Sequence, residues 1–163
     1  VLAMGDALAT VLLKIRGFTR EQFAIFHPGG SLGRRLLWLV RDLMHVGETV
    51  PIVQQDVSVR EAVYEMTRKR LGVTFVVDND GRLSGVFTDG DLRRLLEIEK
   101  NPLDLCIEEA MVKNPKTTSP DSLAAEAMKK MEDHSITVLP VLDENQHPIG
   151  AIHLHDLVRA GMA

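Results

Sequence analysis

Apolar side chains at the amino end of the chain recur at the spacing of one helical face. The positions concerned are Met4, Leu8, Val11, Leu12 and Ile15. Gly17 follows, where the carboxyl end of a helix favours glycine. Thr19 and Gln22 then have the spacing of a capping box for a short second helix, which ends at the turn 27–30. The pattern predicts helices and a glycine-rich loop over residues 1–38, a segment too small to form a hydrophobic core alone.

From about residue 42 onward the chain repeats itself. Positions 65 apart match in the pairs Asp78 and Asp143, Gly85 and Gly150, Asp91 and Asp156, Leu92 and Leu157, Ala62 and Ala127, and Met66 and Met131. Met44 and Met111 match at a separation of 67, so the connecting loops differ slightly in length. Two copies, residues 42–100 and 105–163, account for the rest of the chain.

Both copies predict the same order of elements. A short β segment near Ile52 or Thr117 precedes a helix that begins near Ser58 or Ser122. A hairpin with strands at 73–77 and 83–87, or at 136–142 and 149–153, leads into a last helix that begins at Asp91 or Asp156. The fold class is therefore α/β, of the α+β type, with β-α-β-β-α twice. Because one copy leaves a sheet face uncovered, we expect the copies to pack about a pseudo-twofold axis, with a candidate ligand cleft between them.

Composition and charge exclude several classes of protein. The net charge is −4 and aromatic residues make up 4%, so neither a basic surface nor a base-stacking platform for nucleic acid is expected. Apolar runs are far shorter than the ~20 residues that span a bilayer, and no membrane partner is expected. The single Cys106 cannot close an intramolecular disulfide, which is typical of cytoplasmic proteins, and we interpret it as a buried structural thiol.

Residues 85–94 carry the most informative candidate chemistry, because a strand end here meets a helix start. Amide donors and the helix dipole favour an anion, and the Asp91 carboxylate can accept ribose hydroxyls. A nucleotide satisfies both demands. The candidate ligand residues are Gly85, Thr88, Asp89, Asp91, Arg93 and Arg94. The spacing alone leaves an alternative open: Thr88 and Asp91 only cap the helix, and the arginines form a solvated helix face.

Residues 42–163 resemble a tandem pair of CBS motifs. The resemblance lies in Gly85 with Thr88 and Asp91, in Gly150 with Asp156, and in the run 137–141 before Asp143. It implies a nucleoside site between the motifs, in which Thr88 and Asp91 cooperate with Thr117, Ile136 and Thr137. It also implies a second, weaker site at His153 and Asp156, near Val53 and Val73, where His153 replaces Thr88 and His155 replaces Gly90.

Residues 5–36, which include the HPGG-x-LGR segment, resemble the end of the sugar isomerase domain in D-arabinose 5-phosphate isomerases. The resemblance implies that about half of a parent enzyme precedes this chain, and that this isomerase domain is its natural partner. The parent would interconvert arabinose 5-phosphate and ribulose 5-phosphate, with His27 in its active site. We expect the present chain alone to be inactive, and in it we interpret His27 as closing a helix before Pro28.

The preferred function is regulation of this isomerase by a nucleotide. In the family the product feeds synthesis of the Kdo sugar of lipopolysaccharide, so CMP-Kdo is the preferred ligand and AMP or ATP is the alternative. No cofactor is required. A ligand-free assembly module, forming a dimer or tetramer, is the competing function. His153 and His155 alternate along a strand, but no third ligand is evident, so no metal site is expected.

Overall fold

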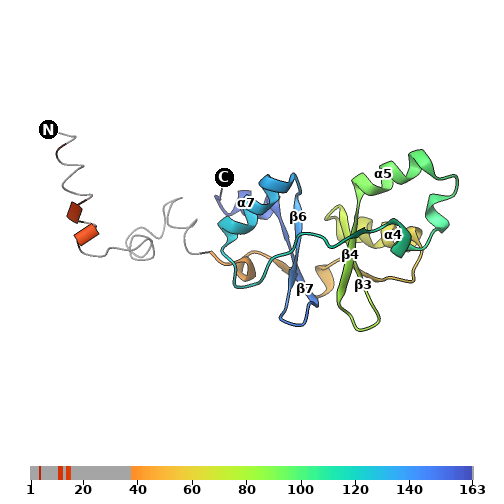
Figure 1. Cartoon of the computed structure of the whole chain (residues 1–163), viewed down its shortest axis with the longest axis horizontal. Helices are drawn as coiled ribbons and strands as arrows, with labels where there is room; N and C mark the ends of the chain where they lie inside the picture. Colours follow the sequence, from red (N-terminus) through yellow and green to blue (C-terminus); the bar gives the residue numbers. More distant parts are fainter. Residues whose placement is uncertain (1–3, 5–10, 13, 16–37, 163) are drawn as a thin grey trace.

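The computed structural model of the chain describes residues 38–162 together with five residues nearer the amino end (Figure 1). Those five are Met4, Val11, Leu12, Lys14 and Ile15, all helical and exposed. The other residues of the two helices predicted at the amino end, and His27, lie outside the described residues. None of the helices among the described residues combines the length and apolar character needed to cross a membrane.

Within residues 38–162 the strands form two sheets. The first has the order β2-β3-β4-β5, with bounds Ile52–Gln54, Val73–Val77, Leu83–Thr88 and Val112–Lys113. The second has the order β1-β7-β6, with bounds His45–Val46, Pro148–His153 and Val138–Leu142. Strand β2 runs parallel to β3, whereas the other neighbours are antiparallel. Helices flank each sheet, so the predicted mixed fold with two β-α-β-β-α motifs is confirmed (Figure 1).

The α-helices are α4 (Val59–Lys69), α5 (Asp89–Ile98), α6 (Ile107–Ala110), α7 (Ala124–His134) and α8 (Leu154–Arg159). Short 3₁₀ helices are η1 (Val40–Asp42), η2 (Gly47–Thr49) and η3 (Pro102–Asp104). Helix α4 begins as predicted, because the Ser58 hydroxyl accepts a hydrogen bond from the Glu61 amide at 3.3 Å. It ends at Arg70, whose backbone is left-handed, with φ of 60°.

The second motif departs from the predicted boundaries at its beginning. Helix α7 has Leu123 as its N-cap, with no side-chain hydrogen bond, although Ser122 precedes it. The β segment expected near Thr117 is a single parallel bridge between Thr118 and Val141. The missing cap has a local cause, because the N-cap position that Ser58 occupies in the first motif is Leu123 in the second, and a leucine side chain has no oxygen to accept from an amide. Backbone pairing with a distant segment is common to both motifs, since the Val40 amide donates to the Ser122 carbonyl and the Ile107 amide donates to the Val57 carbonyl, both at 2.9 Å.

Each motif is completed by the segment that precedes the other motif. The segment 38–46 lies against the second motif, where Val40 is fully buried and β1 pairs with β7. The segment 105–113 lies against the first motif, where Ile107 is fully buried and β5 pairs with β4. The backbone contacts of the two segments are equivalent. The Ala124 amide donates to the Trp38 carbonyl, and the Val59 amide donates to the Leu105 carbonyl, both at 2.9 Å. We call this arrangement the segment exchange.

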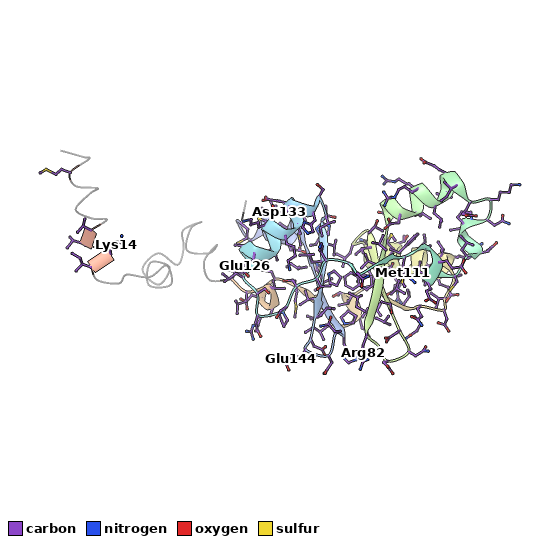
Figure 2. All side chains as sticks on the ribbon, viewed as in Figure 1. Lys14, Arg82, Met111, Glu126, Asp133 and Glu144 are labelled. Atoms are coloured by element: carbon purple, nitrogen blue, oxygen red, sulfur yellow. The ribbon has the colours of Figure 1, made fainter. Side chains whose placement is uncertain are left out.

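A separate apolar cluster joins the two motifs. It contains Val50, Leu71, Val73, Phe75 and Ala151, all buried. Strand β3 is therefore buried along its whole length, with one face toward α4 and the other toward the second motif. The hairpin tips also meet, because the Leu83 amide donates to the Gln146 carbonyl at 3.0 Å. Figure 2 shows Arg82 and Glu144 on these neighbouring tips.

Cys106 lies at the beginning of the exchanged segment 105–113. It is only half-buried, and its thiol donates to the Gln55 carbonyl at 3.2 Å. The expectation of a buried thiol is therefore corrected, because Cys106 forms an isolated backbone bridge with Ser58, outside the core. It is Ile107, the next residue, that enters the core.

Gly85 and Gly150 are required by the close approach of the exchanged strands. A Cβ on Gly85 would lie 2.6 Å from the Met111 sulfur and 2.8 Å from the Val112 carbonyl oxygen. A Cβ on Gly150 would lie 2.8 Å from the Met44 sulfur and 2.9 Å from the His45 carbonyl oxygen. Contacts this short force the neighbouring backbone to move, so any larger residue loosens the exchange.

We therefore expect Gly85→Ala to lower the free energy of unfolding by about 1–3 kcal/mol, because the methyl group overpacks the contact between β4 and β5. Urea denaturation measures the change. Gly90→Ala is the matched control, since a Cβ there meets its nearest neighbour at 3.5 Å, within helix α5. The control should be neutral or stabilising, because alanine favours a helix. Equal stability of Gly85→Ala and the wild type would contradict the role given to the exchange.

Candidate functional site

A cleft of about 910 Å³ lies between the two motifs. Its walls come from segments 70–73 and 88–91 of the first motif and from 114–116 and 134–138, with His153 also lining it. Apolar side chains such as Val86, Val112 and Ile136 share the lining with charged ones. A mostly preformed, partly apolar cleft with a few convergent polar groups is typical of small-molecule sites.

The Asp91 carboxylate is held in place at the start of α5. Its Oδ2 accepts hydrogen bonds from the Thr88 amide at 2.9 Å and from the Thr88 hydroxyl at 2.6 Å. The Asp91 amide in turn donates to the Thr88 hydroxyl at 3.3 Å, which completes a capping box. The Arg94 guanidinium donates to the other carboxylate oxygen, Oδ1. Thr88, Asp91 and Arg94 all line the cleft, so the same carboxylate caps the helix and faces the cavity.

The backbone amides at the start of α5 are partly engaged. The Asp89 amide donates to the Gly72 carbonyl at 3.2 Å, and the Asp91 amide is used by the capping box. An anion at this helix start would therefore use the Gly90 amide together with side chains, rather than a full set of free amides.

The structure gathers some of the predicted ligand residues and separates others. Asp89, Ile136 and Thr137 line the cleft along with Thr88, Asp91 and Arg94. Gly85 lies at the contact with β5, and the exposed Arg93 lies on α5 outside the cleft lining. Thr117 lines a neighbouring, shallower groove of about 560 Å³, where its carbonyl accepts a hydrogen bond from the Lys130 ammonium at 2.7 Å.

The mirror end of the cleft has a different chemistry. The Asp156 carboxylate, equivalent to Asp91 in the repeat, lies 2.8 Å from His45 Nε2 and does not line the cleft. His153 does line it, and its Nδ1 accepts a hydrogen bond from the His155 amide at 2.9 Å. Burial lowers the pKa of His153, and the charge of Asp156 offsets part of this shift. The carboxylate of the second predicted site is therefore paired with a ring nitrogen outside the cleft lining, whereas Asp91 is paired with Arg94 inside it.

Several lining residues were not predicted from the sequence. Arg70 and Gly72 follow helix α4, and Ser135 follows α7; all three have positive φ values, of 60°, 67° and 53°. Lys116 and His134 also line the cleft. The repeat held a signal for Arg70 and Gly72, since segment 70–73 lies 65 positions before 135–138, which contains the predicted ligand residues Ile136 and Thr137, and of 70–73 only Val73 was connected with the second site.

Metal binding finds no support in the part of the chain that the structure describes. There, no group of three His, Cys, Asp or Glu side chains is placed to hold an ion. The rings of His153 and His155 lie 6.5 Å apart between centroids, in an edge-on arrangement. This separation and the hydrogen bond at His153 Nδ1 do not resemble a shared coordination site.

Comparison with known proteins identifies the repeated motif. The family model described as "CBS domain" matches residues 40–98 and 107–163. Arabinose 5-phosphate isomerase KdsD of Pseudomonas aeruginosa is 52% identical over 161 residues, which are 99% of this chain and 49% of that protein. The protein of the same name from Escherichia coli K12 is 47% identical, with the same coverage. The chain thus spans about half the length of the curated relatives it matches.

Solved structures show the same architecture. The CBS domain pair of protein MJ0100, in complex with 5'-methylthioadenosine and S-adenosyl-L-methionine, has a TM-score of 0.67 and 25% identity, covering 76% of this chain and 94% of that one. The CBS-domain containing protein ATU1752 from Agrobacterium tumefaciens has a TM-score of 0.66 and 29% identity, covering 75% and 92%.

We expect His153 to titrate below the ordinary histidine pKa of 6.5, because burial disfavours its charged ring. Asp156→Asn should lower the pKa of His153 further, since it removes the attraction that offsets burial. NMR titration of the imidazole resonances measures both values. Asp104→Asn changes an exposed carboxylate that pairs with Arg60, and it should leave His153 unaffected. A His153 pKa that rises in Asp156→Asn would be inconsistent with this account.

The same shift has a consequence for stability. As the pH falls through about 6.5, the unfolded chain takes up a proton at this position more readily than the folded chain does. His153 therefore contributes a loss of folding stability at acidic pH, which begins near its unfolded pKa and is absent at higher pH.

Proposed function

Because the chain belongs to the CBS domain family, we propose that its two motifs form a regulatory module that binds a ribonucleotide in the cleft. The observation that supports this most is the fixed Asp91 carboxylate in the cleft wall, with its side chain 10% exposed and Thr88 holding one oxygen. A preoriented carboxylate accepts a pair of sugar hydroxyls without further loss of side-chain freedom.

The neighbouring groups suit the rest of a nucleotide. On ribose binding, hydroxyls would replace Arg94 at Oδ1 of Asp91, which releases the guanidinium toward a phosphate. The Gly90 amide, at the start of helix α5, adds a donor for the same phosphate. The apolar wall of Val86, Val112 and Ile136 offers a surface for the base. One ligand would thus contact both motifs at once.

We further propose that the module regulates an arabinose 5-phosphate isomerase of which this chain is a part. The support is its 52% identity to KdsD along almost the whole chain. In this proposal the isomerase domain precedes the chain, His27 belongs to its active site, the assembly is a cytoplasmic dimer or tetramer, and the present chain alone is inactive. A ligand changes the activity only through the difference between its binding free energies for two states of the enzyme. This difference is typically ~1–3 kcal/mol.

CMP-Kdo is the preferred ligand, because the isomerase product leads toward this nucleotide sugar, which could then act by feedback. Adenine nucleotides, AMP or ATP, are the second candidate. They are favoured by the relative MJ0100, whose CBS domain pair was solved with two adenosyl compounds.

A ligand-free assembly module is the competing function. Helix α5 favours it, because none of its residues is buried and Leu96 and Ile98 are 56% and 76% exposed. In that case no nucleotide would raise the melting temperature of the chain, which distinguishes the two functions directly.

Asp91→Asn tests the ribose contact. We expect it to weaken ribonucleotide binding roughly 10- to 100-fold, because hydrogen bonds to a charged group contribute about 1.5–3 kcal/mol. Isothermal titration calorimetry with ribose and 2'-deoxyribose forms of the same nucleotide measures the effect. The wild type should discriminate between the two forms, and Asp91→Asn should not.

The matched control is Asp104→Asn, which removes an exposed carboxylate outside the cleft and should bind like the wild type. If Asp91→Asn kept the full preference for ribose over deoxyribose, the carboxylate would not be the sugar-binding group.

Calorimetric titration with CMP-Kdo and with AMP decides between the ligand candidates. We expect CMP-Kdo to bind more tightly to the chain. Equal or tighter binding of AMP would make the module an adenine-nucleotide sensor, and feedback by the nucleotide sugar would be rejected.

A further inference from the structure

We infer that Arg94 makes the cleft selective for nucleotides over nucleosides, because its guanidinium competes with sugar hydroxyls for Asp91 and binds a phosphate once it is displaced. The inference rests on the proposed function, since it takes Asp91 as the sugar-binding group. It adds a specificity-determining residue and a class of molecule that the cleft binds poorly.

One oxygen of the Asp91 carboxylate is committed to the helix cap, and Arg94 competes for the other. Oδ2 accepts hydrogen bonds from the Thr88 amide at 2.9 Å and from the Thr88 hydroxyl at 2.6 Å. Oδ1 accepts from the Arg94 guanidinium. A sugar hydroxyl that binds this carboxylate without breaking the cap therefore has to compete with Arg94 at Oδ1.

The pairing of Asp91 with Arg94 is not imposed by helical spacing alone. The equivalent residues of α8, 65 positions later in the repeat, are Asp156 and Arg159. The Asp156 carboxylate lies 2.8 Å from His45 Nε2, and within the described residues it forms no ion pair with Arg159. An arginine three positions after the carboxylate thus pairs with it only in the motif whose carboxylate lines the cleft.

The Arg94 side chain can change partners without repacking of its surroundings. It is 71% exposed, whereas the Asp91 side chain is 10% exposed. Its guanidinium nitrogens lie 3.5 and 3.8 Å from where a Cβ on Gly90 would be, at the start of α5. The Gly90 amide is the donor that the proposed function assigns to the phosphate. A short movement over Gly90 therefore takes the guanidinium from the carboxylate to a bound phosphate.

The two classes of ligand differ in what they offer to the displaced guanidinium. A nucleoside leaves it to solvent, so the affinity for a nucleoside is reduced by the ion pair that is broken. A 5'-nucleotide offers its phosphate as the new partner, and one charge-assisted hydrogen bond replaces another. Because the arginine is exposed, the ion pair is weak, and it reduces the affinity for a nucleoside roughly two- to fivefold.

The experiment compares nucleosides with their 5'-monophosphates. Titration calorimetry of the whole chain uses adenosine against AMP and cytidine against CMP, and weakly bound nucleosides are measured by competition with the monophosphate. In at least one of the two pairs we expect the wild type to bind the monophosphate roughly tenfold more tightly than the nucleoside.

Arg94→Met should change the two affinities in opposite directions. Methionine favours a helix as arginine does, but it has no hydrogen-bond donor. The nucleoside should bind roughly two- to fivefold more tightly than to the wild type, because no guanidinium competes at Asp91. The monophosphate should bind roughly tenfold less tightly, because its phosphate loses a charged donor. The preference for ribose over 2'-deoxyribose should remain, since Asp91 is unchanged.

Arg68→Met is the matched control. Arg68 pairs with Glu65 in α4 at the same spacing, three positions apart, and the two side chains are 57% and 12% exposed, close to the values of Arg94 and Asp91. Neither residue of the α4 pair lines the cleft, so both affinities should keep their wild-type values. Melting temperatures near that of the wild type show that both variants fold.

The inference would be overturned by a nucleoside affinity that stays the same or falls in Arg94→Met, or by a monophosphate affinity that does not fall. Equal changes in Arg68→Met, or equal binding of nucleoside and monophosphate by the wild type, would also overturn it. Failure of every nucleotide to bind the wild type would instead reject the proposed function on which the inference rests.

Discussion

The segment exchange is the constraint on which the rest of the structure depends. Neither motif has a complete core of its own, because Val40 fills the second motif and Ile107 fills the first. The exchanged strands then lie so close to β4 and β7 that only glycine fits at 85 and 150. Each motif therefore needs the segment before the other, and the two fold as one unit. Their relative position is set by buried apolar contacts and backbone hydrogen bonds, rather than by exposed charges.

That fixed position places the cleft. The start of α5 and the segments that follow α4 and α7 are separated along the sequence, yet all three line the same cleft. A ligand in the cleft contacts both motifs, so its binding energy depends on their arrangement. Any motion that separates the motifs changes the affinity of the cleft for its ligand. By thermodynamic linkage, the bound ligand changes the equilibrium of that motion by the same factor. This is the physical basis on which such a module could report to a neighbouring catalytic domain.

The two halves of the repeat have diverged in the cleft while keeping the same backbone. Both have a carboxylate at the same position of the last helix, but Asp91 lines the cavity and Asp156 pairs with His45. Two pairs of equivalent residues accompany the difference: Thr88, which holds Asp91, is replaced by His153, and Val112 in β5 corresponds to His45 in β1. Pseudo-symmetric folding thus coexists with an asymmetric site, because the residues that differ between the two halves, Thr88 and His153, lie outside the buried core clusters.

The sequence by itself determined the repeat, the order of elements and the chemistry at Thr88 and Asp91, because hydrophobic spacing, capping boxes and acidic helix starts are local patterns. It also indicated Ile136 and Thr137 through family resemblance. Only the tertiary structure decided the partners across the motifs: that Gly85 faces β5, that Thr117 lies in a separate groove, that Arg70 joins the cleft and that Asp156 is paired. These contacts join residues from different elements of the chain, and no local pattern along the chain encodes which side chain each of them meets.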